Sequence, residues 1–238
     1  MSFYDSLLAK KRTWSPVRPT AAPVVEGAED VIARALSLRV LEIPVGDFIK
    51  DATKKEIPVG SLALLESNIV DEERHDEALR LVAESMEGLI PNYDAEAAKI
   101  CKAWIDAPEH PVLKALVLER SVFFVILPIF RFLGNTGLRT TSADISRDEI
   151  THVSCNSAFC NEMGISLTPN LDKMRKATIA WMTQELNIPN HQYGSKDFWR
   201  RQSDKLLYEG KAPELNESRR SRVPAFFEID NRNLPAYA

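Results

Sequence analysis

Two of the four histidines in this chain follow a glutamate by three residues, and this repeated spacing restricts the possible folds most. The pairs are Glu72 with His75 and Glu149 with His152. Side chains three residues apart lie on one face of an α-helix, so each pair points a carboxylate and an imidazole at one spot. Helical bundles that hold two metal ions use two such helices and take a further carboxylate from each of two others.

The further carboxylates are expected on the helix that precedes each pair. Glu42 lies 30 residues before Glu72, and Glu119 lies 30 residues before Glu149, so the two halves have the same internal spacing. The 47 residues from Glu72 to Glu119 are long enough for the connection between the halves. The sequence therefore predicts a site for two metal ions with six ligands: Glu42, Glu72, His75, Glu119, Glu149 and His152.

Helical periodicity continues through most of the chain, and strand alternation is almost absent, which predicts an all-α fold. Residues 1–26 read as an irregular N-terminal arm, 27–165 as a four-helix core, and 166–238 as additional C-terminal helices with an extended tail. Pro44 is expected to kink or end the first helix, and Ser61 and Ser142 are expected N-caps. We expect helices from about Ile32 to Pro44 and over 61–89, 94–105, 111–133, 143–163, 171–186 and 195–209.

Charge and composition exclude several classes of function. The 30 basic and 34 acidic side chains give a net charge of −4, which argues against nucleic-acid binding or an anionic membrane surface. The three cysteines form no CxxC motif, so we expect neither a disulfide framework nor a thiolate zinc site, and a reducing cytoplasm is the default. The most apolar stretch, Val122–Phe130, is too short to cross a bilayer and predicts a buried helix.

Each candidate ligand also has an interpretation without metal. Glu72 lies in the run DEERHDE, which also suits a solvated helix face, and Glu149 also suits an exposed helix start. Glu119 lies in the most apolar helix, where a carboxylate needs a metal or a partner such as Arg120. Glu42 is close to Pro44, and Asp47 is an alternative ligand.

The remaining histidines and two cysteines are given structural roles. Cys155 and Cys160 follow His152 on the same predicted helix and are expected to be small buried apolar residues. His110 lies in the turn PEHP and is expected at the surface. His191 is expected in a loop and has no carboxylate partner at helical spacing.

Two segments carry a family resemblance. LERSVFFVILPIF and ISRDEITHVS resemble the carboxylate helix and the final Arg-Asp-Glu-x-x-His helix of the small, radical-generating subunit of class I ribonucleotide reductase. That family belongs to the ferritin-like superfamily, and the resemblance covers about residues 30–165. It implies a ferritin-like four-helix bundle whose six ligands are those given above, with an Fe/Fe or Mn/Fe pair.

The resemblance also implies roles outside the ligand set. Asp148 matches an aspartate that links a ligand histidine to a tryptophan of the radical path, and Trp14 is a candidate for that tryptophan. The family usually carries its radical tyrosine one helical turn after the first motif's histidine, where this chain has Leu79. Some members lack that tyrosine and store the oxidising equivalent in a mixed manganese–iron centre. Tyr237 is either a relay residue of the tail or an ordinary residue of the chain end.

The function expected first is activation of O2 to give a one-electron oxidant for a large catalytic reductase subunit. A homodimer is expected, with the large subunit docking through the C-terminal tail. One alternative is a di-iron oxidase or oxygenase whose small-molecule pocket lies near Leu79 and Phe123. Another is a ferroxidase or iron-storage protein, and the last is a helical interaction protein without metal.

Overall fold

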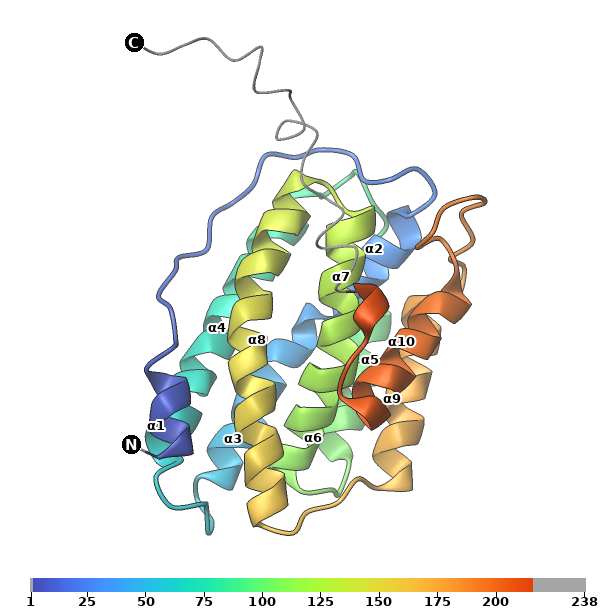
Figure 1. Ribbon diagram of the computed structural model, residues 1–238. Helices are drawn as coiled ribbons and strands as arrows, with labels where there is room; N and C mark the ends of the chain where they lie inside the picture. The colour runs from blue at the N-terminus through green and yellow to red at the C-terminus, as the bar shows by residue number, and fades with distance from the viewer. Residues whose placement is uncertain (1, 216–238) are drawn as a thin grey trace, which may run out of the picture.

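A computed structural model describes residues 2–215, and every regular element in that range is a helix (Figure 1). The only β-type pairings among these residues are two isolated bridges, Glu87 with Ile90 and Asn187 with Ser195. The prediction of an all-α fold is therefore confirmed. No helix in this part of the chain is long and apolar enough to span a membrane.

Four helical rods make up the centre of the molecule, and neighbouring rods pack directly against one another (Figure 1). One rod is continuous but not uniform, because an α-helix passes through a π-helical segment before it resumes as a second α-helix. The rods are α3 (Glu42–Ala52), α4 (Leu62–Ser85), α6 (Pro111–Leu118) with the π-segment η2 (Glu119–Phe123) and α7 (Phe124–Leu133), and α8 (Thr136–Glu162).

The chain enters the first rod through α2 (Glu29–Ser37) and the 3-10 turn η1 (Leu38–Leu41). The sequence predicted that Pro44 kinks or ends the first helix. Instead α2 ends at Ser37, and Pro44 lies in the first turn of α3. The backbone N–H groups of a first turn have no acceptor within the helix, so a proline costs little there. This arrangement places Glu42 at the first residue of α3.

Two predicted helix starts differ from the structure in instructive ways. Ser61 occupies the N-cap position of α4, but its hydroxyl donates to the Pro58 carbonyl instead of accepting from the helix. The expected start of α8 at Ser142 is wrong, because the Asn135 side chain caps this helix by accepting from the Leu138 N–H at 3.0 Å. Ser142 lies inside the helix, where its hydroxyl donates to the Arg139 carbonyl.

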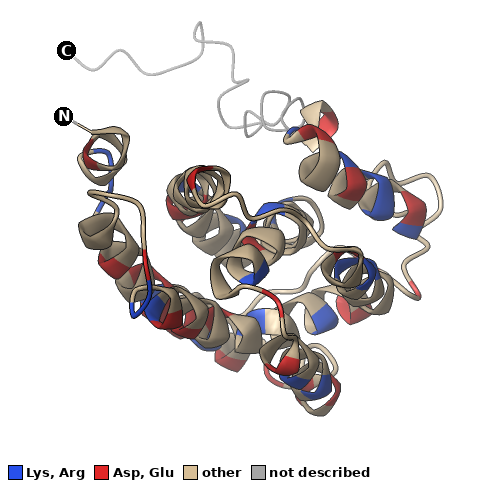
Figure 2. Ribbon diagram, turned by 90° about the horizontal axis from the view of Figure 1, so that it is seen from below, with Lys and Arg blue, Asp and Glu red and all other residues tan. Residues whose placement is uncertain are grey.

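The remaining helices surround this centre. The predicted helices at 94–105, 171–186 and 195–209 correspond to α5 (Asp94–Asp106), α9 (Pro169–Met182) and α10 (Lys196–Glu209). Both α9 and α10 pack against the rod that contains η2. Lysines, arginines and acidic residues are mixed over the helices and do not gather by sign on one side (Figure 2).

The N-terminal arm is not irregular throughout. A short helix, α1 (Phe3–Leu8), begins at a capping box in which Ser2 and Asp5 bond to each other's backbone N–H. The chain then runs without regular structure alongside α4 and α8 before it reaches α2 (Figure 1). This stretch carries Lys11 and Trp14, which reach the site described next.

Candidate metal centre

The structure brings the six predicted ligands together in the interior. Each is at most 1% exposed, so neither a solvated helix face nor an exposed helix start describes them. Asp47, the alternative to Glu42, is exposed. The six side chains come from all four rods: Glu42 from α3, Glu72 and His75 from α4, Glu119 from η2, and Glu149 and His152 from α8.

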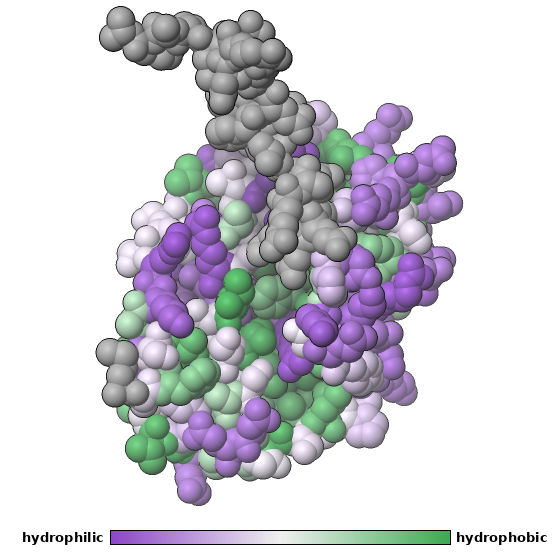
Figure 3. Space-filling view, in the orientation of Figure 1, coloured by the Kyte–Doolittle hydropathy of each residue, from purple (hydrophilic) through white to green (hydrophobic). Residues whose placement is uncertain are grey.

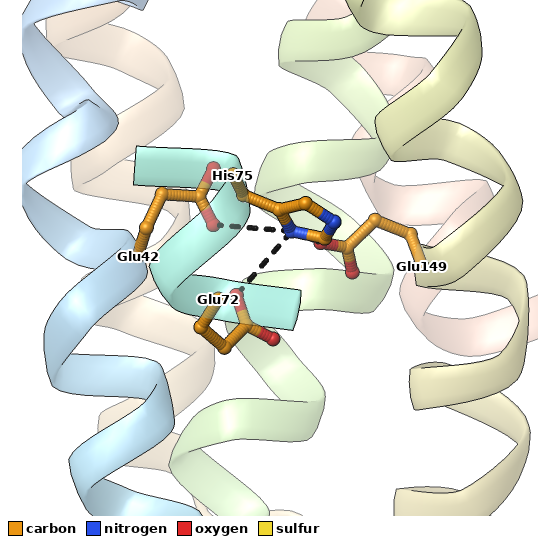
Figure 4. A group of neighbouring side chains, drawn as sticks. All are labelled: Glu42, Glu72, His75 and Glu149. Carbon is orange, nitrogen blue, oxygen red and sulfur yellow. Dashed lines mark ion pairs between the residues drawn. The ribbon is translucent and has the colours of Figure 1, made fainter. Parts of the chain in front are cut away.

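A first group of ligand atoms gathers around His75 (Figure 4). One atom from each of Glu42, Glu72, His75 and Glu149 lies within 4.8 Å of the others. The Nδ1 of His75 is 3.5 Å from Glu72 Oε2, 3.3 Å from Glu149 Oε1 and 3.9 Å from Glu42 Oε2. Three carboxylates and one imidazole nitrogen thus face a single point.

A second group adjoins the first and consists of Glu72, Glu119 and His152. The Nδ1 of His152 is 2.8 Å from Glu72 Oε1 and 3.9 Å from Glu119 Oε1. The two imidazole ring centroids lie 5.6 Å apart. Glu72 belongs to both groups, and its two oxygens face different histidines.

Most polar atoms that face this centre have no hydrogen-bond partner. They include both oxygens of three carboxylates, one oxygen of the fourth, and Nδ1 of each imidazole, so the short distance between His152 and Glu72 is not a well-directed hydrogen bond. Burial of such groups costs several kcal/mol each unless a charge compensates them. Carboxylate and imidazole donors suit iron and manganese. The centre can therefore hold a metal ion, and its donors fit the metals that were expected.

Each imidazole is fixed from outside the centre by an aspartate. Asp148 Oδ2 lies 3.3 Å from His75 Nε2 and also accepts a 2.7 Å hydrogen bond from Trp14 Nε1. The structure thus places Trp14 and Asp148 together, as the resemblance implied. A proton on Nε2 that donates to the aspartate leaves the Nδ1 lone pair facing the centre.

The matching aspartate for the other histidine is Asp71, which the sequence analysis missed. Its Oδ2 lies 3.1 Å from His152 Nε2, and its other oxygen accepts from Arg74 at 2.8 Å. The signal was present, because both motifs read Asp-Glu-x-x-His. Each aspartate supports the histidine of the opposite motif, which the repeat alone does not reveal.

The π-segment η2 was also missed, and it begins at Glu119. A π-turn takes one more residue than an α-turn, and such segments are frequent at functional sites. Glu119 Oε2 accepts a 2.7 Å hydrogen bond from the Asn156 amide on α8. The proposed pairing with Arg120 is wrong, since the Arg120 guanidinium donates instead to the Leu206 carbonyl.

The pKa values of the ligand side chains are shifted as expected for buried ionisable groups that lie close together without a bound cation. Burial, together with the neighbouring carboxylates, raises the pKa of Glu42, Glu119 and Glu149. Burial alone would lower the pKa of His152, but Glu72 and Asp71 outweigh it and raise that pKa to about 10. Burial also opposes the charged form of His75, but Asp148, Glu149 and Glu72 raise its pKa. In the ion-free protein, protons thus occupy the centre, and a bound cation would release them.

Other predicted residues lie farther from the chemistry. Cys155 and Cys160 are buried free thiols, and burial raises the pKa of each to about 12, which fits their expected role. His191 lies in a loop as expected, whereas His110 is half-buried and packs near Phe159. Tyr237 and the tail expected to dock a partner lie outside the described residues.

A surface groove lies on the outer face of α8, between it and the α7 and α10 helices, and has a volume of about 690 Å³. Hydrophobic side chains are exposed on this face of the molecule (Figure 3). Leu79 and Phe123, which were expected to line a substrate pocket, are both 1% exposed in the core and do not line this groove.

Comparisons with protein-family models, with curated proteins and with solved structures gave no match to this chain. The function proposed below therefore rests on the sequence motifs and the geometry of the site.

Proposed function

We propose that this chain is a dimetal-carboxylate protein with a ferritin-like four-helix bundle, related to the small subunit of class I ribonucleotide reductase. In this proposal it binds an Fe/Fe or Mn/Fe pair, forms a homodimer and serves a large catalytic reductase subunit. The ions, when bound, would react with O2 and supply a one-electron oxidant.

One observation carries the proposal, namely the set of buried donor atoms without partners. Nine such atoms, from Glu42, Glu72, His75, Glu119, Glu149 and His152, face one centre from four rods. They divide into two adjoining groups that share Glu72. A stable helical protein without metal would have no use for this arrangement, because the uncompensated burial of so many ionisable groups is strongly unfavourable.

The residues of the chain have separate tasks in this proposal. Glu72 lies between the two imidazoles and would be a ligand shared by both groups. Glu42 and Glu119 complete opposite ends of the centre. Asp71 and Asp148 hold the Nε2 protons and so keep each Nδ1 directed inward. Apolar core residues keep bulk water away, which strengthens every charge interaction inside.

Trp14 offers a route for an electron between this centre and the surface. Its indole donates to Asp148, and its ring is stacked with that of His75 at a centroid distance of 6.2 Å. The Arg74 guanidinium lies 5.6 Å from the centre of the indole ring. Leu79 is buried where the resembling family carries tyrosine, so we propose that the oxidising equivalent is stored on the ions.

Reconstitution tests the proposal. The metal-free chain is loaded with iron, manganese or both, exposed to O2 and followed by EPR. We expect an O2-dependent high-valent or radical signal under at least one loading. When a reductant is added, this signal should decay more slowly in Trp14→Phe than in the native chain. Metal uptake without any O2-dependent species under all three loadings would refute the proposed activity while leaving the metal site intact.

The small-molecule oxidase and the iron-handling protein stay predictions. A product formed without a partner protein would support the first, and a shell of many subunits would support the second.

A further inference from the structure

Two residues of the N-terminal arm, only three positions apart, contact the two aspartates that hold the imidazoles. Trp14 donates to Asp148, which holds His75. Lys11 forms an ion pair with Asp71, which holds His152. The arm therefore contacts the aspartate behind each ligand histidine through a different side chain.

The Lys11 side chain is buried and paired, although it lies in a segment without regular secondary structure. Its side chain is 8% exposed, and its ammonium also donates a 2.7 Å hydrogen bond to Asn68. Its neighbour Lys10 is exposed. Burial of a lysine side chain loses rotamer entropy and hydration, so it persists only where its charge is compensated, and Asp71 supplies that charge.

Three side chains contact the Asp71 carboxylate. It receives Lys11 and His152 on one oxygen and Arg74 on the other. The carboxylate is only 3% exposed, so water does not replace a missing partner. With Lys11 removed, the oxygen that faces His152 loses its cationic partner, and the carboxylate is free to rotate toward Arg74.

We propose that Lys11 is a positioning residue for the second ligand group, acting through Asp71 on His152. The inference rests on the proposed metal binding and adds that the two ions depend on different residues of the arm. Lys11 fixes the imidazole that faces Glu72 and Glu119, whereas Trp14 supports only the His75 side. Loss of an outer partner of a ligand histidine typically weakens metal binding about 10- to 100-fold.

Linkage adds a second consequence. If the docked arm favours an ion in the second group, then that ion must favour the docked arm by the same factor. Trypsin must take the Lys11 side chain into its specificity pocket to cut after it, and this side chain is held against Asp71 while the arm is docked. Mn²⁺ should therefore slow cleavage of the native chain after Lys11.

Titration of the metal-free full chain with Mn²⁺, followed by EPR of the free ion, tests the proposal. In Lys11→Met we expect one ion to bind about tenfold more weakly and the other to be unchanged. Lys11→Arg should restore most of the loss, and Lys10→Met is the matched control with native binding. The melting temperature of each metal-free variant shows whether it has folded.

Two double variants test whether Lys11 acts on metal binding through His152. Lys11→Met should weaken the remaining ion in a His75→Ala background and have no effect in a His152→Ala background. Equal weakening of both ions, an effect that survives in His152→Ala, or native binding in Lys11→Met would each overturn the proposal. If the native chain binds no Mn²⁺ at all, the proposed metal centre itself is wrong, which is a distinguishable result.

Discussion

Lys114 and Glu119 lie on the same helical rod and are both buried, yet only Lys114 is fully satisfied by the protein. The Lys114 ammonium donates to the carbonyls of Trp104, Ile105 and Ala107 at 3.0–3.2 Å. It thereby caps the C-terminal end of α5, where carbonyls lack partners. Glu119 has one hydrogen bond, from Asn156, and its other oxygen faces the centre without a partner.

A second buried cation follows the pattern of Lys114. Arg175 is 1% exposed and reaches Asp172, Asp204 and Ser203. The chain can therefore supply partners for buried charges where it needs them. The contrast teaches that these two buried cations find partners within the protein, whereas the carboxylates and imidazoles of the centre leave most of their inward-facing atoms without one.

The largest effect is expected from removal of a ligand. His152→Ala or Glu119→Ala should weaken one ion by more than about 100-fold, since loss of a direct ligand exceeds the effect of an outer one. Metal analysis after dialysis measures this loss. His191→Ala, which alters a loop histidine, is the control. Equal metal content in all three variants would refute the ligand assignment.

A substitution at Lys114 is expected to lower stability and leave metal content unchanged, which is the opposite of a ligand substitution. Lys114→Met leaves three carbonyls without a donor and should lower the free energy of unfolding by about 3 kcal/mol, at about 1 kcal/mol or more for each lost partner. Urea unfolding of the metal-free protein measures this change, and metal content should stay native. Lys102→Met, at an exposed pair with Asp106 on α5, should cost far less. A Lys114 variant that loses metal but keeps its stability would break the contrast.

The stability of the metal-free protein is also expected to depend on pH, through the ligand side chains of the centre. The pKa of His152 is raised in the folded, ion-free protein to about 10, against 6.5 when unfolded. Its contribution to stability is therefore complete below pH 6.5 and lost as the pH rises toward 10. The raised carboxyl pKa values act in the same direction. The melting temperature of the metal-free chain should fall over this range, whereas that of the metal-loaded chain should change much less; parallel curves would contradict the account.

The smallest effect is expected from neutralisation of one carboxylate. Glu42→Gln replaces a buried carboxylate that has no hydrogen-bond partner and is repelled by the neighbouring carboxylates, so the metal-free chain should gain about 1 kcal/mol at pH 9. The same variant should hold metal more weakly than the native chain. Chemical unfolding with and without Mn²⁺ measures both changes, and a gain in metal affinity would be the contrary result.

Local spacing explains what the sequence could predict. The two Glu-x-x-His pairs and the equal distances to Glu42 and Glu119 depend only on helix geometry, and the structure brings all six side chains together. Asp148 and Trp14 followed from the family resemblance. Asp71 was within reach, because the residue before each motif glutamate is an aspartate in both halves.

The features that were missed depend on contacts between distant residues or on a choice between two residues that suit the same role. Asn135 and Ser142 are both good N-caps, and only the packing of α8 shows which is used. The π-segment at Glu119 leaves no pattern in hydrophobic periodicity over five residues. The contact of Lys11 with Asp71 joins residues far apart in the chain, and an arm that was expected to be irregular offers no periodicity from which to predict it.

Glu72 provides the most direct test of the central claim, because it belongs to both ligand groups. Native protein and Glu72→Ala are loaded anaerobically with Fe²⁺ or Mn²⁺, and the bound ions are counted per chain. The account predicts two ions in the native chain and loss of both in the variant, while His75→Ala and His152→Ala each lose chiefly one. Native occupancy in Glu72→Ala would contradict it.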